Sequence, residues 1–102
     1  MNTLKHLLNA SRRHPLTGEY TLTYDEISAV LQHIMKTGCT VLLGGDVLDV
    51  QMQHLHLNWY YQPDATISPA QNARKSCEAA LQYIQRLADC AQYFYIPVFD
   101  NL

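Results

Sequence analysis

The spacing of apolar residues in the first half of the chain predicts two helices. Leucines at helical spacing mark residues 3 to about 13, and this helix ends before Pro15, because the residue preceding a proline disfavours the α region. Thr23 and Glu26 form a capping box, and the apolar stripe that follows ends at Gly38, a residue suited to a left-handed terminator. The segment between the two helices is expected to be a loop or a short extended piece.

The second half of the chain carries the longest helical pattern and an apolar end. Ser68 caps this helix, Pro69 occupies its first position, Gln71 completes the cap, and the apolar stripe continues through Asp89. The segment YFYIPVF indicates a strand that lies at a sheet edge or ends near Pro97, because proline cannot donate to a β-ladder.

Three more strands are predicted between the second and third helices. CTVLL and DVLDVQM are short apolar runs, and Gly44 and Gly45 between them are interpreted as a turn, since glycine takes a positive φ at no steric cost. The segment HLHLNWYY alternates, so Trp59 shares one face with the leucines and Tyr60 shares the other face with the histidines. Such alternation is typical of a strand with one buried side.

The elements follow the order helix, helix, strand, strand, strand, helix, strand. They predict one α/β domain, residues 1–102, in which about four strands form a sheet and three helices pack mainly on one face. The connection from the third strand through the long helix to the last strand suits a right-handed crossover. The order of the strands stays open.

Composition and charge narrow the class of partner. Apolar residues make up 48% of the chain and charged residues 16%, a balance typical of a folded globule. The pattern contains neither a membrane-spanning run nor a signal peptide, so we expect a cytoplasmic protein with no membrane partner. Residues 14 to 73 carry six acids and one lysine. That stretch disfavours a nucleic-acid partner and suits a basic protein, although ordinary solvation of exposed faces gives the same pattern.

Residues that could carry catalysis are sparse. Cys39, Cys77 and Cys90 are widely spaced, form no CxxC and match no nucleophile motif, so buried free thiols are expected. His54 and His56 have a spacing on a strand that suits a metal, but a third ligand is missing. We therefore expect no enzyme and no cofactor. A small metal- or metabolite-binding enzyme that uses these histidines is kept as an alternative.

The tripeptide GGD at residues 44–46 has three competing interpretations: a tight turn, a phosphate-binding loop and an acidic contact for a partner. A strand rather than a helix follows the glycines, and an aspartate repels phosphate, so the phosphate loop is the weakest of the three. Asp46 is then either a cap on the turn or part of a surface that faces a partner.

Four segments in order, VLLGGDVL, LNWYYQPD, SCEAALQYIQ and YFYIPV, resemble the immunity protein 40 family of bacterial polymorphic-toxin systems. The resemblance covers about residues 24 to 98. The matching positions are Leu43, Gly44, Gly45, Asp46, Asn58, Trp59, Tyr60, Ser76, Ala80, Tyr83 and Ile84.

This resemblance implies a cytoplasmic antidote that binds a cognate toxin domain, often a nuclease delivered by a neighbouring cell, and blocks it without catalysis. A nuclease presents basic surface to its substrate, so acidic residues suit such a partner, and outward aromatic residues bury large area at low entropic cost. An adaptor or secretion chaperone that uses the same aromatic strands stays open as another class, as does the oligomeric state. The candidate partner contacts are Asp46, Asp49, Trp59, Tyr60, Tyr61 and Asp64.

Overall fold

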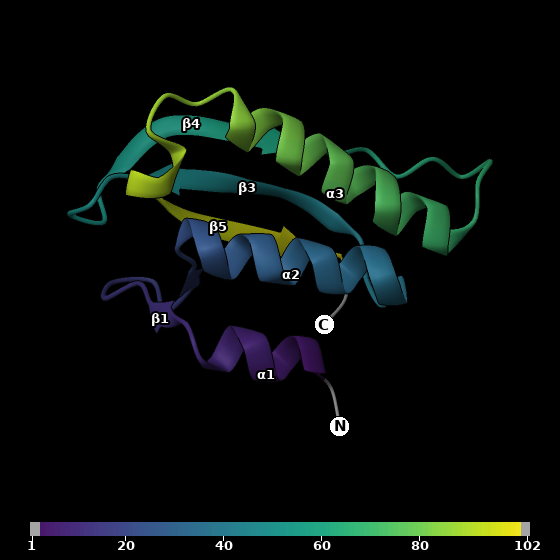
Figure 1. Cartoon of the computed structure of the whole chain (residues 1–102), viewed down its shortest axis with the longest axis horizontal. Coiled ribbons are helices and arrows are strands. Elements are labelled where there is room, and N and C mark those ends of the chain that lie inside the picture. The colour runs from purple at the N-terminus through teal and green to yellow at the C-terminus, as the bar shows by residue number, and fades with distance from the viewer. Residues whose placement is uncertain (1–2, 101–102) are drawn as a thin grey trace.

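The computed structural model describes residues 3–100 and is an α/β fold in which three helices pack with a small sheet (Figure 1). In Figure 1, α2 and α3 lie side by side nearer the viewer than the strands, and α1 lies outside α2. The elements in chain order are α1 (Thr3–Asn9), β1 (Arg12–Arg13), β2 (Tyr20–Thr21), α2 (Tyr24–Thr37), β3 (Leu42–Leu48), β4 (His54–Tyr60), α3 (Pro69–Gln85), the 3₁₀ turn η1 (Cys90–Gln92) and β5 (Phe94–Phe99).

The starts of the two long helices are set by local hydrogen bonds that the sequence predicted. The Thr23 hydroxyl accepts from the Glu26 amide at 3.2 Å, and the Glu26 carboxylate accepts from the Thr23 amide at 2.9 Å. Ser68 and Gln71 make the same reciprocal pair at the start of α3. At the end of α2, Gly38 adopts the left-handed conformation with φ 65°. Both capping boxes and the glycine terminator are therefore confirmed.

Two predicted helix ends were wrong. The first helix ends at Asn9 rather than near residue 13, and β1 pairs with β2 in a short antiparallel hairpin instead. The last helix ends at Gln85 rather than at Asp89, which takes a left-handed φ of 57°. Leu87 lies in the turn after the helix and still packs against the core, so an apolar residue at this position did not indicate a longer helix.

The main sheet has the order β4-β3-β5, with β3 antiparallel to both neighbours. β4 and β5 therefore run in the same direction on either side of β3, and α3 makes the crossover between them. Leu22 adds a bridge to Tyr95 through two hydrogen bonds of 2.8 Å, which brings the β1–β2 hairpin beside β5. The α/β class with three helices is confirmed, with five strands in two sheets rather than about four in one. β5 is an edge strand of its sheet, as Pro97 predicted.

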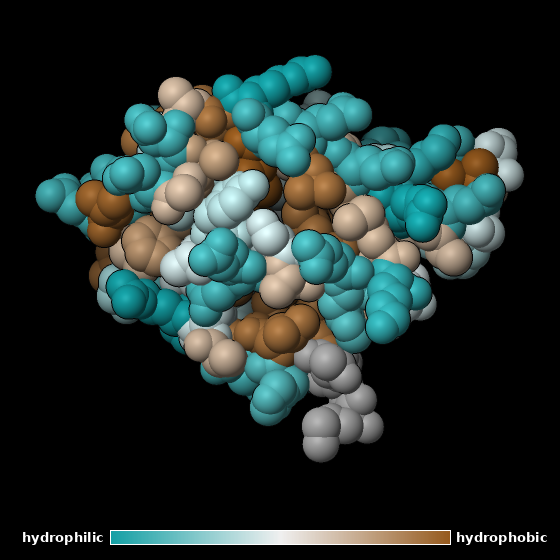
Figure 2. Space-filling model, in the orientation of Figure 1, coloured by the Kyte–Doolittle hydropathy of each residue, from teal (hydrophilic) through white to brown (hydrophobic). Residues whose placement is uncertain are grey.

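The core lies between the sheet and the two long helices. Side chains from α2, α3, β3 and β5 meet there at 0–1% exposure, among them Ile27, Ile84, Val47 and Tyr95. A buried Ser76 on α3 ties the helix to the sheet, because its hydroxyl accepts from the Leu42 amide at 3.0 Å and donates to the Ala73 carbonyl at 2.7 Å. On the outer, helix-covered side the surface is mostly hydrophilic, with scattered apolar side chains (Figure 2).

The glycine pair lies inside β3, so the predicted turn at Gly44 and Gly45 was wrong, and CTVLL and DVLDVQM contribute to one strand rather than two. Gly45 pairs with Trp59, and a Cβ at Gly45 would overlap the indole ring and approach the Ile96 carbonyl oxygen to 2.8 Å. At Gly44 a Cβ would strike the backbone of β4, 2.9 Å from the Cα of Tyr60. Both glycines are needed for close approach to β4 and not for a turn.

Candidate functional site

The sheet has one face without a helix, which we call the open face: the side of β4-β3-β5 opposite α2 and α3. Directly paired residues of antiparallel strands point to the same face, so the register identifies its members. Trp59 and Val47 belong to the core cluster and mark the helix-covered face. The open face carries three cross-strand rows: Tyr60, Gly44 and Val98; Asn58, Asp46 and Ile96; and His54, Leu48 and Phe94.

A hollow of about 230 Å³ lies on the open face over the glycine pair. In the row Tyr60–Gly44–Val98 the middle residue has no side chain, so the two outer side chains become walls and the strand backbone becomes the floor. Tyr60 is 82% exposed and Val98 is 43% exposed. We call this concavity the glycine hollow. Its lining residues are Leu43, Gly44, Gly45, Asp46, Asn58, Trp59, Tyr60 and Val98.

Asp46 lines the glycine hollow and is half-buried. Within residues 3–100 its carboxylate makes no hydrogen bond or ion pair, and the side chain of Asn58, directly opposite, makes no hydrogen bond either. The oxygens of this carboxylate are free to accept hydrogen bonds, so the group is suited to a cationic donor supplied from outside the chain. Sequence reasoning singled out Asp46 and Tyr60 but missed Asn58 and Val98, which share the site only through strand register.

The other two candidate acids are engaged by their own loops. Asp49 begins the β3–β4 connection, and its Oδ1 accepts from the amides of Gln51 at 2.8 Å and Gln53 at 3.0 Å. Asp64 follows β4, and its Oδ1 accepts from the amide and hydroxyl of Thr66 at 2.8 and 2.6 Å, bonds that lower the pKa of Asp64. Both carboxylates shape turns, and they lie beyond opposite ends of the β3–β4 pair. The acidic residues therefore do not form one continuous patch.

The three consecutive aromatic residues of β4 and its extension have different environments. Trp59 is only 7% exposed and stacks on Tyr83 with ring centroids 5.5 Å apart, which removes its indole from the candidate partner contacts. Tyr61 is half-buried and donates a 2.7 Å hydrogen bond to Asn72; burial, with a smaller effect of Asp64, raises its pKa. Tyr60 alone of the three is fully available to a partner. The reason is the alternation of the strand, which turns Trp59 to the helices and Tyr60 to the open face.

The opposite end of the open face is occupied by the β1–β2 hairpin. Arg12 lies over the ring of Phe94 at 5.5 Å, and the ring of His14 lies 6.2 Å from that of His54. His14 Nδ1 accepts from the Leu16 amide at 3.1 Å, which assigns the proton to Nε2, 3.3 Å from the Met52 carbonyl. This arrangement buries His14 and leaves the glycine hollow as the accessible part of the open face.

The pair of histidines that suggested a metal site is not joined by a third ligand within the described chain. Among residues 3–100, no three histidine, cysteine, aspartate or glutamate side chains come together as metal ligands would. His56 has a positive φ of 58° next to the register shift between β3 and β4, so it lies at a β-bulge. Its neighbour His54 faces His14 rather than an acid.

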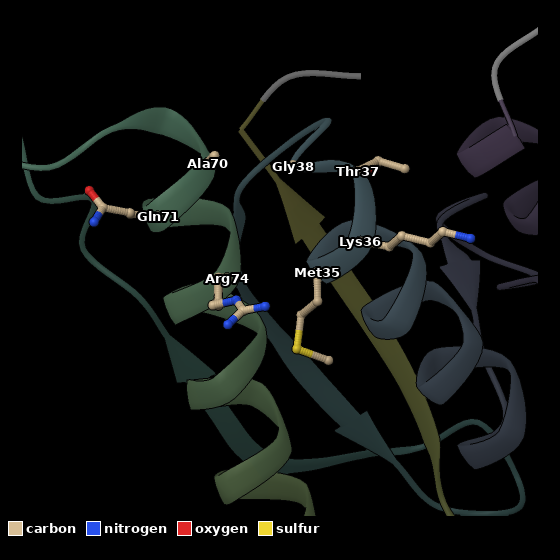
Figure 3. A pocket seen from close by; sticks show the side chains of 7 residues that line it. All are labelled: Met35, Lys36, Thr37, Gly38, Ala70, Gln71 and Arg74. Carbon is tan, nitrogen blue, oxygen red and sulfur yellow. The ribbon is translucent and has the colours of Figure 1, made fainter.

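A larger hollow of about 460 Å³ lies where the end of α2 meets the start of α3 (Figure 3). Arg74 extends toward Met35 across this space, whereas Lys36 points away from it (Figure 3). Its lining contains no acid, histidine or cysteine that could act as a base or nucleophile. Gln71, a further lining residue, is already used in the capping box of α3.

The three cysteines differ in exposure, so the expectation that all are buried was wrong. Cys39 is exposed, Cys90 is half-buried and Cys77 is buried. Burial raises the pKa of the Cys77 thiol to about 11, and the thiol is therefore protonated near neutral pH. Within residues 3–100, none of the three cysteines makes a hydrogen bond or ring contact with a histidine that could act as its base.

No helix within residues 3–100 has the length and apolar character required to cross a bilayer. The family model for immunity protein 40 matches residues 11–99, nearly the whole chain. No curated protein and no solved structure matches the chain.

Proposed function

The chain belongs to the immunity protein 40 family, and from this premise we propose that it neutralises a cognate toxin domain by stoichiometric, non-catalytic binding. The toxin is a nuclease of a polymorphic, contact-dependent inhibition system. The complex forms in the cytoplasm of the protected bacterium. Neutralisation in this form requires a surface that recognises a protein and does not require an active site.

The observation that carries this proposal is the glycine hollow with its unpaired carboxylate. The surface offers an exposed aromatic ring at Tyr60, an exposed aliphatic wall at Val98 and the charge of Asp46 within one small area. Aromatic anchors next to a pocket are typical of the residues that dominate binding energy at protein interfaces. The hollow is smaller than the roughly 300–1,000 Å³ common for small-molecule sites, which favours a protein partner.

A nuclease partner accounts for the sign of the charge. Nucleases carry basic residues that contact phosphates, and these residues are the ones an inhibitor has to occupy. Asp46 is suited to that contact, and Asp49 and Asp64 extend a negative potential along the two adjacent loops. We expect a standard-sized interface of about 1,600 Å² in total, centred on the open face.

The proposed function is tested by co-expressing the chain with the toxin domain encoded immediately upstream of its gene. We expect the toxin alone to stop growth, the pair to restore growth, and a one-to-one complex to co-purify. Nucleic-acid integrity in cells that carry the toxin alone identifies a nuclease. Continued killing with no complex, against a toxin shown to be active alone, would refute the proposal.

A further inference from the structure

We propose that the glycine hollow accepts one arginine side chain of the toxin domain, with the guanidinium paired to Asp46 and lying against the ring of Tyr60. This inference rests on the proposed function and deepens it, because it names the group on the partner that the open face recognises. It follows from the shape of the hollow, the state of its carboxylate and the chemistry of its walls.

The shape comes from a requirement of the sheet itself. Gly44 lacks a side chain because a Cβ there would collide with the backbone of β4, and the missing side chain leaves a gap between Tyr60 and Val98. In most sheets a side chain from the central strand fills this position, so a partner meets a convex surface. Here a partner side chain is able to reach the backbone of the central strand.

The single acidic side chain in the hollow selects a cation. Asp46 is the only aspartate, glutamate, lysine, arginine or histidine among the lining residues, and its carboxylate has no partner within residues 3–100. The acids on the neighbouring loops are hydrogen-bonded to their own turns, whereas Asp46 is not. A half-buried carboxylate with free lone pairs forms strong charge-assisted hydrogen bonds with a donor that enters the hollow.

The walls favour arginine over lysine. A planar guanidinium stacks on an aromatic face while it donates two hydrogen bonds to one carboxylate, and an ammonium group does not combine these contacts. Tyr60 supplies an exposed ring on one side, and the amide of Asn58 supplies a further acceptor beside Asp46. An anion is disfavoured, because the lining residues include an aspartate and no lysine, arginine or histidine.

The test measures affinity between the purified chain and the toxin domain by calorimetry, with three substitutions and one control. Asp46→Asn keeps the shape and removes the charge, Tyr60→Ala removes the ring, and Val98→Trp fills the hollow without changing any charge. Glu78→Gln, which removes one exposed acid from α3 on the other side of the molecule, is the matched control. Circular dichroism and thermal unfolding verify that each variant is folded.

We expect each of the three open-face substitutions to weaken binding by roughly tenfold or more, and Glu78→Gln to change it by less than about twofold. Asp46→Asn should also reduce the dependence of affinity on salt. Substituting each toxin arginine by alanine should identify one whose loss is not additive with Asp46→Asn.

The inference is overturned, while the proposed function stands, by a wild-type complex that Asp46→Asn leaves unchanged or by one that Val98→Trp leaves unchanged. In the second case the charge acts at a distance and the hollow is not occupied. A lysine rather than an arginine as the coupled toxin residue would overturn the choice of side chain. Absence of a wild-type complex with an active toxin would remove the function itself.

Discussion

The two faces of the β4-β3-β5 sheet use neighbouring residues in opposite ways. On the helix-covered face, Trp59 is 7% exposed and its indole fills the space over Gly45. On the open face, Tyr60 is 82% exposed and the space over Gly44 is empty. The same glycine pair thus makes room for a core side chain on one side and leaves room for a partner on the other. Residues that hold the fold therefore face the helices, and the residues of the proposed partner surface face away from them.

The largest difference between the faces is expected from truncating the two adjacent aromatic residues. Trp59→Ala should lower the free energy of unfolding by about 3–5 kcal/mol, because it leaves a large cavity in the core. Tyr60→Ala should change it by less than about 0.5 kcal/mol, because the ring is on the surface. Urea unfolding of both variants measures the difference. Similar losses for the two would show that the faces are not distinct.

Trp59→Phe sharpens the same comparison. The indole Nε1 is buried without a hydrogen-bond partner among residues 3–100, so phenylalanine removes an unsatisfied donor together with part of the ring. We therefore expect a much smaller loss than for Trp59→Ala.

Gly45→Ala should have the next largest effect. The added methyl group overlaps the indole of Trp59, and the strain should cost up to about 3 kcal/mol. In the background of Trp59→Phe the cost should be smaller, because the ring atoms of the clash are absent. Denaturant unfolding of the single and double variants measures this coupling. If the losses of the two single variants simply add in the double variant, the methyl group of Gly45→Ala clashes with the backbone of β5 rather than with the indole of Trp59.

Ser76→Ala tests the link between α3 and the helix-covered face. It removes the acceptor of the buried Leu42 amide and should lower the free energy of unfolding by about 1–2 kcal/mol. Asn58→Ala on the open face is the control, because the side chain of Asn58 makes no hydrogen bond within the described residues. Thermal or urea unfolding provides the measurement, and a larger loss for Asn58→Ala would contradict the division between the faces.

The smallest effect is expected at Asp64, where it depends on pH. Hydrogen bonds from Thr66 lower the pKa of this carboxylate in the folded chain, so it contributes stability above its ordinary pKa. That contribution is lost as the pH falls through the lowered pKa. Asp64→Asn should be slightly less stable than the wild type at pH 7, and the difference should vanish in strong acid. Unfolding curves at both pH values measure the difference in stability between the variant and the wild type. A difference that grows in acid would contradict a lowered pKa for Asp64.

Local signals in the sequence predicted the helix starts correctly because their causes are local. The capping boxes at Thr23 and Ser68 and the terminator at Gly38 depend on residues within one turn. The end of α3 was placed too late because Leu87 continues the apolar pattern although it lies beyond the helix, where it packs against the core from a turn. The short extended piece expected between the first two helices contains β2, but β1 and its pairing with β2 were missed because strands of two residues have no measurable periodicity.

The glycine pair shows where sequence reasoning reaches its limit. Glycine permits a turn and also permits close approach of another strand, and the choice depends on Trp59, which lies fourteen residues after Gly45. The glycine hollow is equally non-local, because Gly44, Tyr60 and Val98 come from three strands. Asp46 and Tyr60 were found from charge and strand alternation, but Val98 required the register of β5.

The use of the open face for recognition is tested most directly by NMR chemical-shift mapping of the isotope-labelled chain as the toxin domain is added. We expect the largest changes at the glycine hollow, in the amides of Gly44, Asp46, Asn58, Tyr60 and Val98, with the outer surfaces of α2 and α3 nearly unchanged. Changes confined to α2 and α3, with the hollow unaffected, would show that the partner binds the helical side and would contradict recognition through the open face.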